Sequence, residues 1–130
     1  MISLHEVKIE TERLLLMPTT QDYAEGFFNE FTAEVTEFMF PKPAENLDET
    51  RRFIDESRRG LEAGTNLHMV IVDKTTAEFL GCVGLHDIGS GCPEFGVWLK
   101  IAAHGNGFGF EAVSALKKWA DENLKCEAYL

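Results

Sequence analysis

The spacing of apolar residues divides the chain into short segments that alternate between strand-like and helix-like patterns. Short apolar runs bounded by turn residues are typical of strands, and apolar residues at i, i+3, i+4 and i+7 indicate one buried helix face. The pattern predicts a strand over 7–17, helices over 21–31 and 49–63, strands over 66–73, 79–88 and 94–99, a helix over 110–124 and a strand from residue 126. This order predicts an α/β fold with a mixed sheet that is antiparallel in its middle.

Capping and turn residues refine these boundaries. Asp48 is a suitable N-cap for the second helix, and Gly64 is a suitable C-terminal stop. Gly81 and Gly84 lie inside an expected strand, where glycine indicates a bulge or close backbone packing. Residues 36–43 contain aromatic side chains between prolines and are expected to form a loop or a short helical turn.

Composition restricts the class of function. The chain of 130 residues is 45% hydrophobic, which is enough for one folded domain, and no apolar run approaches the length of a membrane span. Its net charge of −10 disfavours nucleic-acid binding and is compatible with a cationic partner, although acidic surfaces commonly serve solubility alone. The three cysteines and four histidines have no metal-ligand spacing, so we expect no metal site, reduced thiols and a cytoplasmic location.

The segment with the most chemical information is the glycine-rich stretch over 104–109, which reads His-Gly-Asn-Gly-Phe-Gly. It lies between an expected strand and an expected helix, and a helix N-terminus with outward N–H groups favours anions. It is not a phosphate-binding loop of the Gly-Lys-Ser/Thr type, because those residues do not close it. The preceding strands are expected to form hairpins, which also argues against a dinucleotide-binding fold.

Four motifs taken together resemble the GNAT superfamily of N-acetyltransferases. They are IETERLLL at 9–16, GCVGLHDI at 81–88, EFGVWL at 94–99 and HGNGFGFEAV at 104–113. The likeness runs along the whole chain in the correct order and is greatest to the branch of ribosomal-protein N-terminal alanine acetyltransferases. It implies a GNAT-like sheet with helices on both faces, acetyl-CoA as co-substrate and no metal.

The resemblance also implies which residues hold acetyl-CoA. The strand backbone of Val97, Trp98 and Leu99 would bind the pantetheine arm. The backbone N–H groups of the glycine-rich segment would bind the pyrophosphate, and their residues are His104, Gly105, Asn106, Gly107, Phe108 and Gly109. The family usually has Gln or Arg at the place of His104 and often Pro at the place of Ile101, so this segment departs from the pattern at two positions.

In the family the acetyl group passes directly to a primary amine, either a protein N-terminal α-amine or a small-molecule amine. The amine must lose a proton before it can attack, so a general base is needed. Glu94 is the first candidate, although a carboxylate at a strand end is often only solvated. His86 and Asp87 are second candidates, and we do not expect Cys92 to carry the acyl group.

The C-terminal end of the chain raises an alternative function. In the family a further helix and two strands follow the strand expected from Cys126, and they supply a tyrosine that protonates the leaving thiolate; Tyr129 is too early to be that residue. We therefore expect residues 1–130 to form a single acetyltransferase-like domain that is C-terminally incomplete, with homodimer or edge-strand pairing. The alternative is a non-catalytic CoA-binding or interaction module.

Overall fold

The computed structural model describes residues 4–33, 35, 43–89 and 93–124. Its elements are the 3₁₀ helices η1 (Leu4–Glu6), η2 (Gln21–Tyr23) and η3 (Ile101–Ala103), the helices α1 (Ala24–Glu30), α2 (Leu47–Ala63) and α3 (Phe108–Asn123), and the strands β1 (Ile9–Glu10), β2 (Leu14–Pro18), β3 (Leu67–Asp73), β4 (Phe79–His86) and β5 (Glu94–Leu99). The strands lie in the order β1-β2-β3-β4-β5 and each neighbouring pair is antiparallel. The predicted fold class is confirmed, and within the described range the sheet contains antiparallel pairs only.

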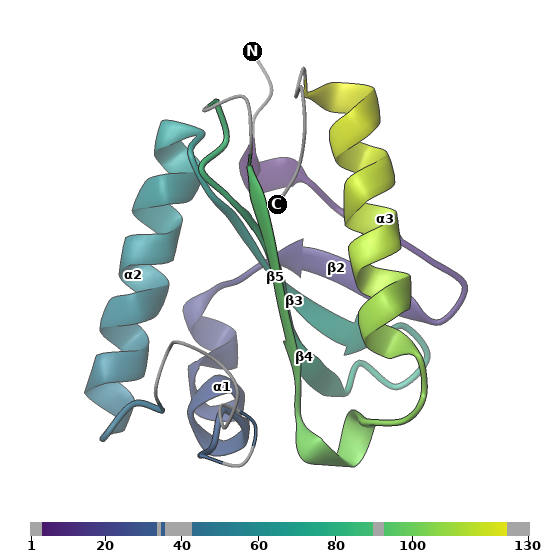
Figure 1. The fold of residues 1–130 in the computed structure, drawn as a ribbon. Helices are drawn as coiled ribbons and strands as arrows, with labels where there is room; N and C mark the ends of the chain where they lie inside the picture. Colours follow the sequence, from purple (N-terminus) through teal and green to yellow (C-terminus); the bar gives the residue numbers. More distant parts are fainter. Residues whose placement is uncertain (1–3, 34, 36–42, 90–92, 125–130) are drawn as a thin grey trace.

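Figure 1 shows the sheet between two helical layers, with α1 and α2 on one face and α3 on the other. Successive strand residues point to opposite faces, so each central strand supplies both layers. The α1 side buries Phe27, Phe31, Val70, Val72, Cys82 and Trp98. The α3 side buries a larger set that includes Leu14, Leu16, Met69, Ile71, Val83, Leu85, Ala112, Leu116 and Ala120. Burial on both faces explains why β3 and β4 read as nearly continuous apolar runs.

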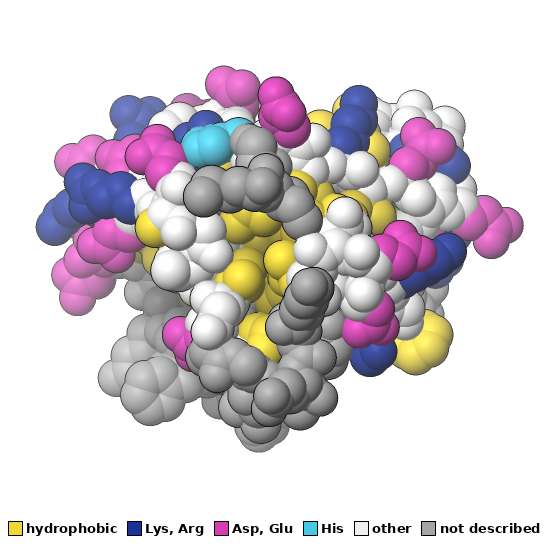
Figure 2. Space-filling view, turned by 90° about the horizontal axis from the view of Figure 1, so that it is seen from above, with side chains coloured by type: hydrophobic (Ala, Val, Ile, Leu, Met, Phe, Trp, Pro, Cys, Tyr) yellow, Lys and Arg dark blue, Asp and Glu magenta, His cyan; other side chains and the backbone are white. Residues whose placement is uncertain are grey.

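One end of the molecule exposes part of this apolar interior. Figure 2 shows hydrophobic side chains at the floor of a central hollow, while acidic and basic side chains lie toward the outside. On the described surface of this end, charged side chains do not cover the hydrophobic floor of the hollow. Within the described part of the chain, no helix is both long enough and apolar enough to cross a membrane.

The prediction of one continuous strand over 7–17 was wrong. The structure has a short hairpin there, because the chain reverses between β1 and β2. The Thr11 N–H donates to the Leu14 carbonyl oxygen at 2.9 Å, and the Leu14 N–H donates to Thr11 Oγ1, also at 2.9 Å. The Thr11 side chain thus satisfies a backbone group that a continuous strand would have paired elsewhere.

The second helix starts earlier than predicted. Asn46, and not Asp48, is its N-cap, and the Asn46 side chain accepts a hydrogen bond from the Glu49 N–H at 3.0 Å. The helix ends as predicted at Gly64, whose φ of 76° is in the left-handed region. Helix α3 also begins two residues earlier than predicted, so Phe108 and Gly109 belong to its first turn.

The predicted bulge at Gly81 is present. The register between β3 and β4 shifts between Ile71 and Val72, and a Cβ on Gly81 would lie only 2.1 Å from the Trp98 carbonyl oxygen. The backbone of β5 therefore approaches β4 as closely as a glycine permits. The strand expected from Cys126 and most of the loop expected over 36–43 lie outside the described residues.

Replacing Gly81 by Ala should lower the free energy of unfolding by about 2 kcal/mol, because β5 must move away from β4 to admit the methyl group. Gly26→Ala is the matched control. Its Cβ would lie 3.5 Å from Phe79 in ordinary contact, and alanine is favoured within helix α1. Urea titration followed by circular dichroism measures both; equal midpoints for the Gly81 variant and the wild type would contradict the close approach.

Candidate active site

The site is built on the free edge of β5. The Lys100 N–H donates to the Leu80 carbonyl oxygen at 2.9 Å, which places the backbone groups of alternate β5 residues toward β4. By the same alternation, the N–H and C=O of Val97 point to the opposite edge, and no described strand covers them. An extended chain can add to such an edge through backbone hydrogen bonds.

A cavity of about 290 Å³ lies beside this edge. It is lined by Val35, Val97, Trp98, Leu99, His104 and Gly109. Gly109 is in ordinary contact range of the strand, since a Cβ there would lie 3.7 Å from Leu99 Cδ1 and 4.0 Å from Val97 Cγ2. The cavity therefore brings together the strand residues and part of the glycine-rich segment.

The glycine-rich segment presents a row of free backbone donors. Gly105 and Gly107 have φ values of 81° and 77°, which glycine adopts without strain, and Gly107 is the N-cap of α3. The N–H groups of residues 105 to 110 have no hydrogen-bond partner within the described range, and the first bonded one is that of Glu111, which donates to the Gly107 oxygen at 3.1 Å. The helix dipole adds a positive potential at the same place.

His104 differs from its neighbours in this segment. Its N–H donates to the Ile101 carbonyl oxygen at 3.0 Å and is therefore not a free donor. Its Nε2 lies 2.8 Å from the Leu99 carbonyl oxygen, which can only accept, so Nε2 carries the proton. The Asn106 side-chain amide donates to the carbonyl oxygens of Ala103 and His104, both at 3.2 Å. The ring bond ties the segment to the end of β5, and the other bonds stabilise the connector itself.

Glu94 and His86 face each other at the start of β5. They are cross-strand partners in the register, and their place in the strand alternation puts both on the α1 side of the sheet with Trp98. The His86 ring covers two glycines, because a Cβ on Gly84 or Gly96 would lie 3.3 or 3.4 Å from ring atoms. Glu94 is exposed, and so its carboxylate is open to an incoming group.

Asp87 follows on the turn after β4. Its φ of 57° is left-handed, and its N–H donates to Asn66 Oδ1 at 3.2 Å. This geometry gives Asp87 a role in closing the turn. Cys92 lies outside the described residues.

The sequence did not single out His68, which lies next to this group. It is the cross-strand partner of Gly84, and its Nδ1 lies 2.7 Å from the Thr19 hydroxyl oxygen. Its ring packs on Phe27 and Phe53, with ring centroids 6.0 and 5.3 Å away. Burial, with a smaller contribution from the charge of His86, lowers the pKa of His68 to about 4, so His68 is neutral at pH 7. A lone polar residue within an apolar strand was the only sequence signal.

The model of the acetyltransferase (GNAT) domain family matches residues 13–129. The chain belongs to the GNAT acetyltransferase family. The predicted family is therefore confirmed, and the match covers the edge of β5, the glycine-rich segment and Glu94. No curated protein sequence matches the chain.

Solved structures share the fold of this GNAT domain. The ribosomal-protein-serine acetyltransferase described as putative from Vibrio cholerae is 21% identical with a TM-score of 0.77, over 91% of this chain and 68% of that one. RimL, a ribosomal L7/L12 α-N-protein acetyltransferase in complex with CoA, is 15% identical with a TM-score of 0.75, over 88% and 67%. The microcin C7 self-immunity acetyltransferase MccE, in complex with acetyl-CoA and AMP, is 20% identical with a TM-score of 0.74, over 88% and 66%. At these identities the likeness shows the fold.

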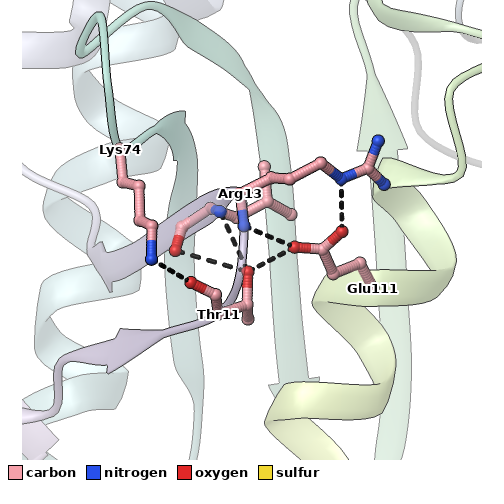
Figure 3. Close-up of polar contacts among 5 residues, drawn as sticks. Thr11, Arg13, Lys74 and Glu111 are labelled. Atoms are coloured by element: carbon pink, nitrogen blue, oxygen red, sulfur yellow. Dashed lines mark hydrogen bonds and ion pairs between the residues drawn. The ribbon is translucent and has the colours of Figure 1, made fainter.

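Two motifs of the GNAT domain that lie about a hundred residues apart are joined directly (Figure 3). Arg13 Nε lies 2.7 Å from Glu111 Oε1, and the Arg13 N–H donates to Oε2 at 3.1 Å. The Thr11 hydroxyl also donates to Oε2, and the guanidinium lies 4.5 Å from the centre of the Phe108 ring. The turn between β1 and β2 thereby holds the first turn of α3.

The contacts of Thr11 and Arg13 with Glu111, which we call the Glu111 clamp, change the pKa of its carboxyl group. Partial burial by itself would raise the pKa of Glu111, but the hydrogen bonds from Thr11 and Arg13 and the guanidinium charge lower it below its usual value. A carboxylate with a lowered pKa stabilises the folded state at neutral pH. That contribution is lost as the pH falls through the folded-state pKa.

Glu111→Gln should lower the free energy of unfolding at pH 7 by about 1 to 2 kcal/mol, because it removes a charge-assisted pair. The difference from wild type should shrink as the pH falls below about 4. Glu10→Gln is the control, since Glu10 makes an exposed 3.7 Å pair with Lys74 and should change stability by less than about 0.5 kcal/mol. Urea unfolding at several pH values measures both; a difference that stays constant down to pH 3 would rule out the ionised clamp.

His68 should make the fold weaker in mild acid. The unfolded chain takes up a proton near pH 6.5 while folded His68 resists it down to about pH 4, so about 3 kcal/mol of stability should be lost between pH 7 and pH 4. His68→Phe keeps a ring of similar shape and should remove that slope, at some cost to stability at pH 7 from the unpaired Thr19 hydroxyl. Parallel slopes for the variant and the wild type between pH 7 and pH 4.5 would refute the lowered pKa of His68.

Proposed function

We propose that this GNAT domain transfers the acetyl group of acetyl-CoA to a primary amine that attacks directly in a ternary complex. The observation that carries the proposal is the cavity between the free edge of β5 and the N-terminus of α3. It has unpaired backbone groups on both sides, and membership of the acetyltransferase family supports the reaction class.

The residues present suit acetyl-CoA. The N–H and C=O of Val97 suit the amide groups of the pantetheine arm, which would lie along the edge as an added strand. The side chains of Trp98 and Leu99 line the cavity beside it. The free N–H groups of residues 105 to 109 suit the pyrophosphate oxygens. His104 contributes here by fixing the segment to Leu99.

The proposed chemistry needs a base on the amine side. The thioester of acetyl-CoA supplies an activated acetyl group. The exposed Glu94 carboxylate takes one proton from the ammonium group and so frees the nitrogen lone pair. The nitrogen attacks the carbonyl carbon, the C–N bond forms and the C–S bond breaks. The second proton that the nitrogen then loses passes through water to the CoA thiolate, which leaves as the free thiol. His86 lies beside Glu94 on the same face and is the second candidate, while Asp87 is the third because its backbone closes a turn.

A protein N-terminal α-amine is the preferred acceptor, because RimL, which is named for that reaction, shares the fold. A small-molecule amine is the alternative, and the net charge of −10 suits a cationic acceptor of either kind. We place the reaction in the cytoplasm, whose reducing conditions suit the free thiol of Cys82. Burial raises the pKa of this thiol and so keeps it protonated. Pairing between two copies of the chain stays a prediction.

Isothermal titration with acetyl-CoA, followed by a CoA-release assay over a panel of amines, tests the function. We expect saturable binding, and Glu94→Gln should reduce kcat by about a hundredfold without changing acetyl-CoA affinity. Glu62→Gln, an exposed carboxylate on α2, is the matched control and should leave kcat unchanged.

The outcomes separate the parts of the proposal. Absence of binding at millimolar acetyl-CoA would refute the proposed cofactor site. Binding without turnover for any amine would favour a CoA-binding module instead. Unchanged turnover in Glu94→Gln would refute Glu94 as the general base. His86 would then be the candidate, and His86→Gln tests it.

A further inference from the structure

Phe110 is exposed in a way that the fold does not explain. Its side chain is 82% exposed, and it belongs to neither hydrophobic core cluster of the described chain. Three of the four exposed large apolar side chains among the described residues, those of Val97, Ile101 and Phe110, lie in the segment from β5 to the first turn of α3. Single exposed apolar residues are ordinary, but this grouping coincides with the proposed cofactor site.

The position of Phe110 around helix α3 places it on the free-edge side. Gly109 faces Val97 and Leu99, while Glu111 faces Arg13 on the other side of the helix. Consecutive helix residues are turned by about 100°, so Phe110 lies between these directions, on the outer surface next to Gly109. Its own N–H is one of the free donors of the first turn. A phosphate held by this turn therefore lies within one residue of the ring.

The chemistry of the proposed ligand fits an aromatic ring there. With the pantetheine arm along β5, the pyrophosphate is at the glycine-rich segment and the nucleoside must continue outward from it. Phe110 offers a flat and exposed aromatic face at this outer surface. Stacking on an aromatic ring is an effective contact for a nucleobase and needs no enclosing wall.

We propose that Phe110 is a binding residue for the adenine of acetyl-CoA, on which the base stacks while the first turn of α3 holds the pyrophosphate. This inference rests on the proposed function and assigns to it a nucleoside subsite. Because Phe110 contributes little buried area to the fold, its removal should affect ligand binding and leave stability unchanged.

The test compares two ligands by isothermal titration to the full chain. Acetyl-CoA carries the nucleoside, and acetyl-4′-phosphopantetheine carries the same thioester and arm without it. Phe110→Ala should raise the Kd for acetyl-CoA about five- to fiftyfold and change the Kd for acetyl-4′-phosphopantetheine by less than about twofold. Phe110→Trp should retain acetyl-CoA binding. Phe53→Ala, which removes an exposed aromatic side chain on α2 outside this segment, is the control and should change neither value.

The adenine protons give an independent signature. Their NMR resonances should move upfield on binding to the wild type, because they lie over the ring, and should not move on binding to Phe110→Ala.

Each contrary result is decisive. If Phe110→Ala binds acetyl-CoA like the wild type, or weakens both ligands equally, stacking is refuted while the proposed function stands. Equal affinity of the wild type for the two ligands also refutes it. If the wild type binds neither ligand, the proposed function fails and the nucleoside subsite with it.

Discussion

The contact between Glu111 and the turn formed by Thr11 and Arg13 is the constraint on which the site depends. A site made of backbone N–H groups has no long side chain that could adjust to its ligand, so the position of the helix end must be fixed from outside. Glu111 does this on one side of α3, and the packing of Gly109 against β5 does it on the other. The His104 ring fixes the connector to the Leu99 oxygen. The N–H groups between these anchors are left unpaired.

This arrangement also gives a role to the histidine that departs from the family pattern. A Gln or Arg at position 104 would offer its side chain to the phosphates, whereas His104 uses its ring and its N–H within the chain. Because the His104 ring donates to the Leu99 oxygen, the attraction for an anion comes from the other backbone N–H groups and from the helix dipole. In the proposed site, His104 would therefore position the segment and would not bind the ligand itself.

The sequence was informative where structure is set locally. The bounds of β5, the end of α2 at Gly64 and the bulge at Gly81 follow from short apolar runs and from the conformational freedom of glycine, and all three agree with the structure. The break between β1 and β2 was missed, because the polar interruption at Thr11 is brief and β-compatible. The motifs containing Arg13 and Glu111 were each recognised, but their contact was not, since pairing across about a hundred residues leaves no local pattern. His68 was missed for the same reason, because its Thr19 partner lies on another strand end.

The strand alternation of β5 separates the two halves of the proposed reaction. Val97 and Leu99 face the α3 side and Glu94 and Trp98 face the α1 side, while the cavity at the edge is lined from both sides. A cofactor that lies along the edge therefore presents its thioester to a base that approaches from the other face. On that face Gly84 and Gly96 leave room for the His86 ring, and the half-buried His68 lies opposite Gly84. In the proposed reaction the amine therefore approaches from the α1 face, and the side chains of that face would distinguish one amine from another.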